Sequence, residues 1–146
     1  MIPRDKLKNL EIQGGCLFHG TGVIIEKFEP RQSHTIINSV PILDGEPAIF
    51  ASPFTEYAIF MALVNEENCP LGYRSGCAYE NGILQFTATK ETLEQLTDES
   101  KGYVYVFDKA KFTERSASEW VSHGELMPLT VVEVTRSDFA TEIKEI

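Results

Sequence analysis

The chain has 146 residues, of which 42% are hydrophobic and 24% charged, so we expect one domain spanning 1–146 with an apolar core. Its formal net charge of −9 disfavours non-specific nucleic-acid binding, because proteins displace the counterions of a polyanion with lysine and arginine. No apolar run approaches the roughly 20 residues that span a bilayer. The polar N-terminal segment predicts a cytoplasmic protein, or one secreted by a route that leaves no signal-peptide apolar region, without a membrane partner.

Short apolar segments alternate with turn residues in the first third of the chain. Residues 4–13 suit either a short helix or an extended lead-in. Residues 16–19 predict a buried strand that ends at Gly20, and residues 23–28 suit a short helix or a strand. The prolines, glycine and small polar residues of 30–47 predict a long loop, a type of segment that often covers a site.

The middle of the chain predicts a strand that leads into the main helix. Residues 48–51 form a short apolar run between two prolines. Ser52 suits the N-cap of the helix, with Pro53 at its first position, where the missing N–H costs nothing. The helix is apolar on much of its surface and should stop near Asn65. Residues 65–82 indicate a second loop or an irregular hairpin.

The second half of the chain predicts mostly strands. Residues 83–88 alternate loosely as a strand, and Thr89 suits the N-cap of a helix at 90–97. A turn at 101–102 precedes the clearest strand, 103–107, which is β-branched and aromatic throughout.

Two further strands, 119–122 and 129–134, precede a polar tail. The three cysteines lack metal-ligand spacing, so we expect free thiols and no metal site. The predicted elements do not alternate as βαβ units, and no Gly-x-Gly-x-x-Gly pattern follows a strand. These features favour an α+β fold over a dinucleotide-binding α/β domain.

His19, Gly20 and Thr21 form the first group with chemical potential. A lone histidine at the end of a strand is more often structural than functional. Here, however, Gly20 has no Cβ, so a ligand can approach the main chain, whose N–H and C=O suit a carboxamide. Thr21 adds a hydroxyl, and the His19 ring can donate an N–H to a sugar hydroxyl.

The second group supplies aromatic rings and a cation. Phe50, Phe54, Tyr57 and Phe60 either fill the core between strand and helix or provide a flat face for a planar heterocycle, for which Tyr57 is favoured by its polar tip. Arg31 is either an exposed surface residue or a ligand for a pyrophosphate, since arginine forks suit phosphate oxygens.

Glu119 is the third candidate and has two interpretations. It is either an exposed carboxylate at a strand edge or a carboxylate that faces a cleft. In a cleft, it would hold a ribose hydroxyl and stabilise positive charge at the anomeric carbon while an N-glycosidic bond breaks.

Three segments resemble motifs of the ADP-ribosyltransferase superfamily, in the branch of the poly(ADP-ribose) polymerases and diphtheria toxin. Residues 17–21 (Leu-Phe-His-Gly-Thr) resemble its His-Gly-Thr/Ser motif. Residues 49–52 (Ile-Phe-Ala-Ser) resemble a Tyr-Phe-Ala-Asp stretch, and residues 118–121 (Ser-Glu-Trp-Val) an Asn-Glu-Tyr-Ile segment. The resemblance is closer to short bacterial relatives than to larger members. It implies small split antiparallel sheets around an NAD cleft.

The resemblance implies an NAD-dependent mono-ADP-ribosyltransferase or NAD glycohydrolase with an unknown acceptor. Glu119 would be the key catalytic residue, and Phe60 falls where nicotinamide stacks. Ile49 replaces the usual tyrosine, and Ala117 leaves no Gln/Glu-x-Glu motif, which disfavours arginine as the acceptor. The catalytic candidates are His19, Tyr57 and Glu119, and the NAD-binding candidates are His19, Gly20, Thr21, Arg31, Phe50, Ser52 and Phe60. The alternatives are a non-catalytic module that binds a nucleotide or ADP-ribose, and an RNA 2′-phosphotransferase.

Overall fold

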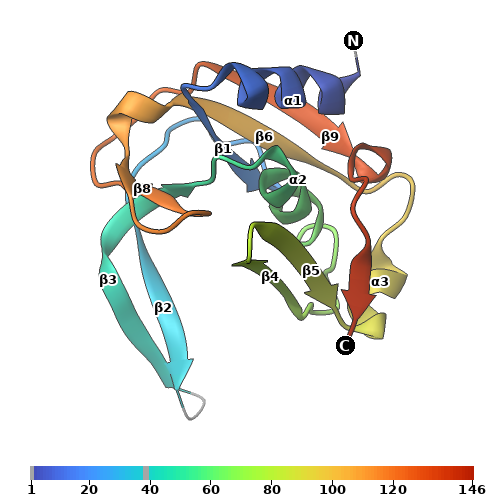
Figure 1. Cartoon of the computed structure of the whole chain (residues 1–146). Helices are drawn as coiled ribbons and strands as arrows, with labels where there is room; N and C mark the ends of the chain where they lie inside the picture. Colours follow the sequence, from blue (N-terminus) through green and yellow to red (C-terminus); the bar gives the residue numbers. More distant parts are fainter. Residues whose placement is uncertain (1, 38–39) are drawn as a thin grey trace.

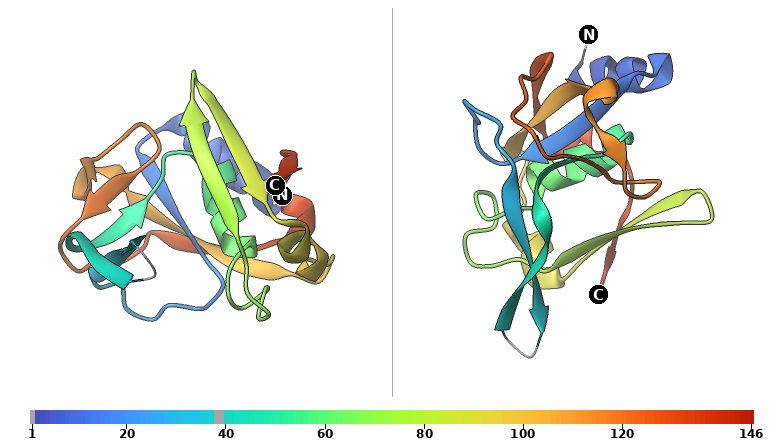
Figure 2. Two further views of the ribbon diagram at one scale, coloured as in Figure 1. Left: turned by 90° about the horizontal axis from the view of Figure 1, so that it is seen from below. Right: turned by 90° about the vertical axis from the view of Figure 1, so that its left-hand side faces the viewer.

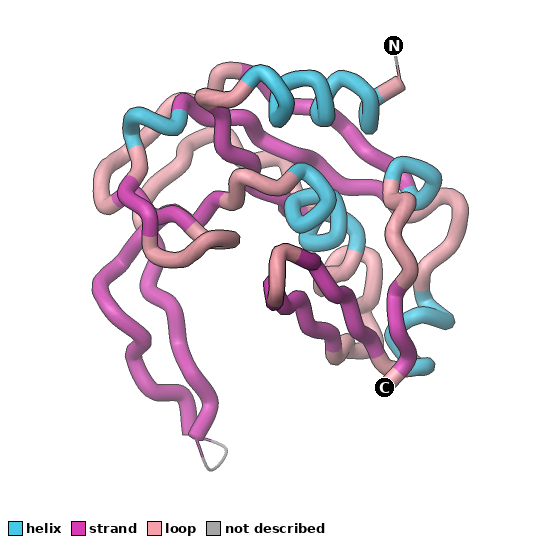
Figure 3. The backbone as a smooth tube through the Cα atoms, viewed as in Figure 1, coloured by secondary structure: helices cyan, strands magenta, loops and turns pink. Residues whose placement is uncertain are grey.

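A computed structural model describes residues 2–37 and 40–146, with side chains outside 32–46. It confirms an α+β architecture, in which short helices accompany three small sheets (Figure 1, Figure 3). The elements in chain order are α1 (Pro3–Gln13), β1 (Cys16–Thr21), β2 (Arg31–Ile37), β3 (Val40–Ala51), α2 (Thr55–Leu63), β4 (Ser75–Glu80), β5 (Ile83–Ala88), α3 (Lys90–Gln95), β6 (Lys101–Asp108), η1 (Lys109–Lys111), β7 (Thr113–Glu114), β8 (Trp120–Ser122), β9 (Thr130–Thr135), η2 (Arg136–Asp138) and β10 (Ile143–Glu145).

The antiparallel sheet β1-β6-β9 separates two hydrophobic cores. Successive side chains of a strand point to opposite faces. Phe18 therefore packs with α2 in the first core, which also holds Phe60 and Phe86, whereas Leu17 joins the second core with Phe28. Helix α2 lies against β1 and β6, and the sheet thus gives the helix a fixed position.

The hairpin β2–β3 is a correction to the loop predicted for residues 30–47. Its two strands pair antiparallel and extend away from the rest of the chain (Figure 1, Figure 2). The loop was predicted because of the prolines in this segment. Pro41, however, lies in the part of β3 that pairs only with β2 among the described strands. A strand paired on one side accepts a proline whose nitrogen faces the open side. The far end of β3 pairs with β8, which joins β2, β3, β8 and β7 into one sheet.

The third sheet, β10-β5-β4, contains a hairpin of β4 and β5, so residues 65–82 hold a loop and only the first strand of a hairpin, not the whole hairpin given as one alternative. Asn81 and Gly82 both have positive φ, as the tight turn of such a hairpin requires. The polar tail is a wrong prediction, because β10 pairs parallel with β5 and Phe139 is buried against Phe60 and Phe86. Two apolar side chains of this otherwise polar segment, Phe139 and Ile143, pack in or against the first core.

The start of α2 also differs from the prediction. Ser52 is not its N-cap, because the helix begins at Thr55 and Ser52 is still bridged to Phe18 of β1. Glu11 of α1 takes over the capping, since its Oε1 accepts hydrogen bonds from the N–H and the hydroxyl of Thr55, both at 2.7 Å. The predicted end near Asn65 is confirmed within two residues.

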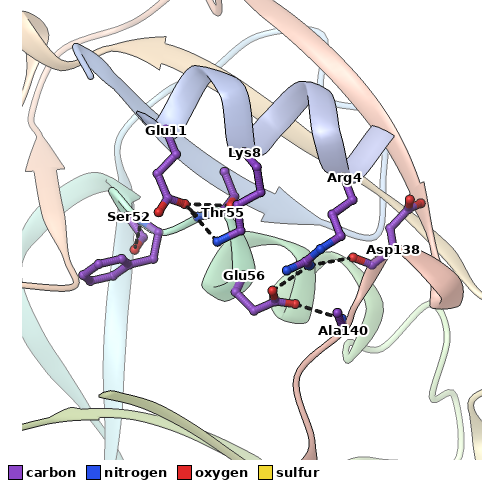
Figure 4. A network of polar contacts seen from close by, with 9 residues as sticks. Arg4, Lys8, Glu11, Ser52, Thr55, Glu56, Asp138 and Ala140 are labelled. Carbon is purple, nitrogen blue, oxygen red and sulfur yellow. Dashed lines mark hydrogen bonds and ion pairs between the residues drawn. The ribbon is translucent and has the colours of Figure 1, made fainter. Parts of the chain in front are cut away.

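A polar network attaches both chain ends to α2 (Figure 4). Arg4 of α1 pairs with Glu56 at 2.6 Å and donates to the carbonyl of Asp138 at 3.0 Å. Glu56, only 5% exposed, also accepts from the N–H of Ala140 at 3.1 Å. Every carboxylate oxygen of Glu56 thus has a partner, as a buried charge requires.

The remaining predictions have mixed outcomes. The helix alternative for 4–13 and the Thr89 N-cap are confirmed. Strand β1 continues through Gly20, and residues 101–102 begin β6 instead of forming a turn. Residues 23–28 form a loop that ends in an isolated bridge from Phe28 to Leu126. Within the described residues, no helix has the length and apolarity that crossing a membrane requires.

Candidate functional site

The candidate site is a cavity of about 350 Å³ beside β1. Its walls come from β1, the end of β3, α2 and the loop between β7 and β8. The volume falls within the range of roughly 300–1,000 Å³ that is typical of small-molecule sites. Six of the candidate residues line it: His19, Gly20, Phe50, Ser52, Tyr57 and Glu119. We call this space the Glu119 cavity.

The main chain of Gly20 faces the cavity at the free edge of β1. Phe18 and Ser52 exchange two backbone hydrogen bonds of 2.8 Å across this edge. Backbone groups alternate between the two edges of a strand, so Gly20, two residues after Phe18, directs its N–H and C=O to the same side. Among the described residues, no backbone partner lies beyond Ser52 on this edge. An unpaired donor and acceptor are therefore available there for a ligand.

The absence of a side chain at Gly20 has a different cause from the one expected. A Cβ at this position would overlap the carbonyl oxygen of Ala58 and lie 2.8 Å from the nitrogen of Ala62. Glycine is thus required for the close packing of α2 on β1. The expectation that the missing Cβ makes room for a ligand is corrected, although the main chain still lines the cavity.

His19 lies on the opposite face of β1 from α2. Its Nδ1 is 2.6 Å from the carbonyl oxygen of Phe50, which can only accept, so Nδ1 carries a proton. Burial lowers the pKa of His19, and Arg31 lowers it further, against the opposing effect of the bond to Phe50. The neutral ring then offers Nε2 as an acceptor. The N–H donation expected for His19 toward a ligand is therefore replaced by an acceptor at Nε2, which suits a ligand hydroxyl that donates.

Helix α2 forms the apolar wall. Tyr57, Ala58 and Met61 line the cavity from the helix, and Met61 lies three and four residues after the other two, which places it on their face. Burial raises the pKa of Tyr57, with smaller contributions from Cys77 and Glu119. The phenol therefore keeps its proton at neutral pH and can donate a hydrogen bond.

Phe60 corrects the ring position implied by the family pattern. It is 1% exposed and packs against Phe86 and Phe139, with ring centroids 4.9 and 5.7 Å away. It therefore belongs to the first core and does not line the cavity. Ser52 lines the cavity but is 2% exposed, and its hydroxyl accepts from the N–H of Phe54 at 3.1 Å, which indicates a structural role.

Glu119 enters the cavity from a closed loop between β7 and β8. The N–H groups of Arg115 and Ser116 donate to the Glu119 carbonyl at 3.0 and 2.9 Å, and the Glu119 N–H returns to Ser116 at 3.4 Å. The side chain of Glu119 is 35% exposed and pairs with Arg115 at 3.4 Å. A solvated carboxylate on a fixed loop can act as a charged group toward a ligand.

A second cavity of about 210 Å³ adjoins the first and shares His19 and Phe50 with it. Thr21 and Arg31 line this second cavity and not the Glu119 cavity. Lys27 also lines it, but its charge is paired with Glu29 at 3.0 Å and Glu125 at 3.4 Å. Apart from Phe60, the candidate residues therefore line two adjoining cavities that share His19 and Phe50.

Sequence reasoning missed Arg115, Ser118 and Met61, which also line the Glu119 cavity. Arg115 lies four residues before Glu119 in a polar run, and only the tight loop brings the two side chains together. The position of Met61, one helical turn after Tyr57, was a usable signal once Tyr57 was chosen.

No protein-family model matches the chain, and no curated protein or solved structure matches it significantly. Across the described residues, no group of three or more His, Cys, Asp or Glu side chains is arranged to hold a metal ion. The chemistry of the site therefore has to be inferred from its own geometry.

Proposed function

We propose that the chain binds NAD and cleaves the bond between nicotinamide and ribose, passing ADP-ribose to an acceptor or to water. The observation that carries the proposal is the Glu119 cavity itself. It gathers the Gly20 edge, the Phe50 and Tyr57 rings and the Glu119 carboxylate from segments far apart in the sequence. An ADP-ribosyltransferase-like arrangement of the sheets is part of this proposal.

Nicotinamide suits the part of the cavity near β1. Its carboxamide needs one acceptor and one donor, and the C=O and N–H of Gly20 offer both on one edge. Its flat ring suits the aromatic side chains of Phe50 and Tyr57, because offset stacking and edge contacts stabilise planar heterocycles. Tyr57 replaces Phe60 as the proposed ring contact from α2.

Glu119 supplies the charge that the reaction needs. When the C1′–N1 bond breaks, its electron pair goes to the ring, which leaves as neutral nicotinamide. Positive charge then develops at C1′ and O4′ of the ribose, and a fixed carboxylate stabilises it. The nucleophilic atom of the acceptor bonds to C1′, and its proton passes to solvent.

The rest of the dinucleotide would extend past His19 toward the second cavity. A ribose hydroxyl donates to the neutral Nε2 of His19, whose tautomer the Phe50 carbonyl fixes. The guanidinium of Arg31 suits the pyrophosphate, and Thr21 adds a hydroxyl beside it. This division follows the two adjoining cavities that His19 and Phe50 share.

Nicotinamide release from NAD tests the proposal. Wild-type protein is incubated with NAD, and the products are separated by chromatography. Free ADP-ribose would identify water as the acceptor, whereas ADP-ribose bound to an added protein or nucleic acid would identify a transferase. Release that persists unchanged in Glu119→Gln would contradict the proposed role of this carboxylate.

The ion pair between Arg115 and Glu119 favours a second candidate, a non-catalytic module that binds NAD or ADP-ribose. A carboxylate paired with a guanidinium gives less stabilisation to a developing cation. Calorimetry that detects NAD or ADP-ribose binding, together with no nicotinamide release, would support this candidate. Absence of binding to both compounds would exclude it.

A further inference from the structure

Arg115 occupies a particular position in the Glu119 cavity, between an aromatic ring and a carboxylate. Its Nη1 lies 3.4 Å from Oε1 of Glu119, and its Cζ lies 5.8 Å from the centroid of the Phe50 ring. Both distances allow attraction, since a guanidinium interacts with an aromatic face within about 6 Å. The same two groups, Phe50 and Glu119, are those that a ligand in this cavity would use.

A guanidinium and the nicotinamide ring of NAD share three properties. Both are planar, both carry one positive charge, and both spread that charge over several atoms. We propose that Arg115 determines specificity by occupying the place of a planar cationic ring, and that a ligand binds by exchanging its own cation for the guanidinium. The inference rests on the proposed function for the identity of the ring. It goes further in naming the class of ligand as planar organic cations.

The loop around Arg115 is built so that the side chain can leave without opening it. The three backbone hydrogen bonds among Arg115, Ser116 and Glu119 involve no side chain. The strands on either side also pair, with Glu114 opposite Trp120. The side chain of Arg115 is 46% exposed, so its guanidinium can move into solvent. Rotation of the Arg115 side chain would therefore leave these backbone hydrogen bonds in place.

Selectivity follows from charge. A neutral ring that displaced Arg115 would leave Glu119 without a partner, whereas a cationic ring would replace the ion pair that is lost. Removing the guanidinium should therefore strengthen cation binding, because the ligand no longer competes with it. The gain is roughly three- to tenfold, given the modest strength of exposed ion pairs and exposed cation–π contacts.

The test compares two small probes that differ in charge. The 1-methylnicotinamide cation and neutral nicotinamide are titrated by calorimetry into wild type, Arg115→Met and Arg136→Met. Arg136 is a matched control, because its guanidinium also lies over an aromatic ring, that of Phe139 at 6.0 Å, but lines neither cavity. Thermal unfolding of each protein checks that the fold is kept.

We expect Arg115→Met to bind 1-methylnicotinamide roughly three- to tenfold more tightly, with a smaller change for nicotinamide. Arg136→Met should bind as wild type does. Weaker or equal cation binding by Arg115→Met overturns the inference, as does the same gain in Arg136→Met or no detectable binding by any of the three. Failure of the proposed function is a separate result, namely tighter cation binding without any release of nicotinamide from NAD.

Discussion

Replacing Gly20 with alanine would place a methyl group against the main chain of α2. The added Cβ overlaps the carbonyl oxygen of Ala58 and lies 2.8 Å from the nitrogen of Ala62. Neither atom can rotate away as the end of a flexible side chain would, so the helix and strand must separate. Overpacking of a well-filled core costs about 1–3 kcal/mol, and a clash with backbone falls at the upper end.

Chemical denaturation of wild type and Gly20→Ala measures this effect. We expect a loss of about 2–3 kcal/mol in the free energy of unfolding, a large part of the 5–15 kcal/mol typical of native proteins. Gly102→Ala should behave alike, because its Cβ would overlap the carbonyl oxygen of Ala62 from β6. Gly124→Ala is the matched control, since its Cβ would meet no atom within 4 Å.

A change within about 0.5 kcal/mol for Gly20→Ala, equal to that of Gly124→Ala, would refute this reasoning. It would mean that α2 adjusts freely on β1. In that case, neither the position of Tyr57 nor that of Met61 in the Glu119 cavity would be fixed by the packing.

Three further predictions concern single side chains. Burial lowers the pKa of His19 below 6.5, so the unfolded chain binds a proton at this residue more readily than the folded chain does. The contribution of neutral His19 to the free energy of unfolding is therefore present above about pH 6.5 and declines as the pH falls. The difference in unfolding free energy between wild type and His19→Gln should thus shrink from about pH 7.5 to about pH 5, and a constant difference would contradict it. Burial raises the pKa of Cys77 to about 12, so alkylation followed by mass spectrometry should be roughly 10³-fold slower than in the unfolded chain, and equal rates would count against it. Phe60→Ala should lose about 3–5 kcal/mol of stability on denaturation and Tyr57→Phe less than about 1 kcal/mol, whereas similar losses would return Phe60 to the candidate site.

The glycines show where prediction from sequence was limited. Gly20 was expected to end a strand and to let a ligand approach the main chain, and Gly102 to lie in a turn, but both lie within strands and make room for α2. In a sequence, a glycine is equally compatible with an unusual backbone conformation and with close packing that excludes a side chain. Only the position of α2 in the folded chain shows that packing is the reason here. The strand 103–107 was predictable because its β-branched and aromatic residues need no such context.

The candidate site likewise contains residues that could be predicted from sequence and residues that could not. His19, Phe50, Tyr57 and Glu119 were chosen from local patterns, and the structure brings all four to one cavity. Phe60 was placed there by motif spacing, although its ring is buried in the first core against Phe86 and Phe139. Arg115 could not be predicted, because its relation to Phe50 depends on the register between β3 and β8.

The turnover of NAD by Glu119→Gln tests the central claim most directly. The substitution keeps the size of the side chain and removes its charge, so NAD should still bind while nicotinamide release falls about 10²–10³-fold. Glu114→Gln, at an exposed position of the same hairpin, should release nicotinamide at the wild-type rate. Equal rates in all three proteins, or no release by the wild type with any acceptor, would contradict the account.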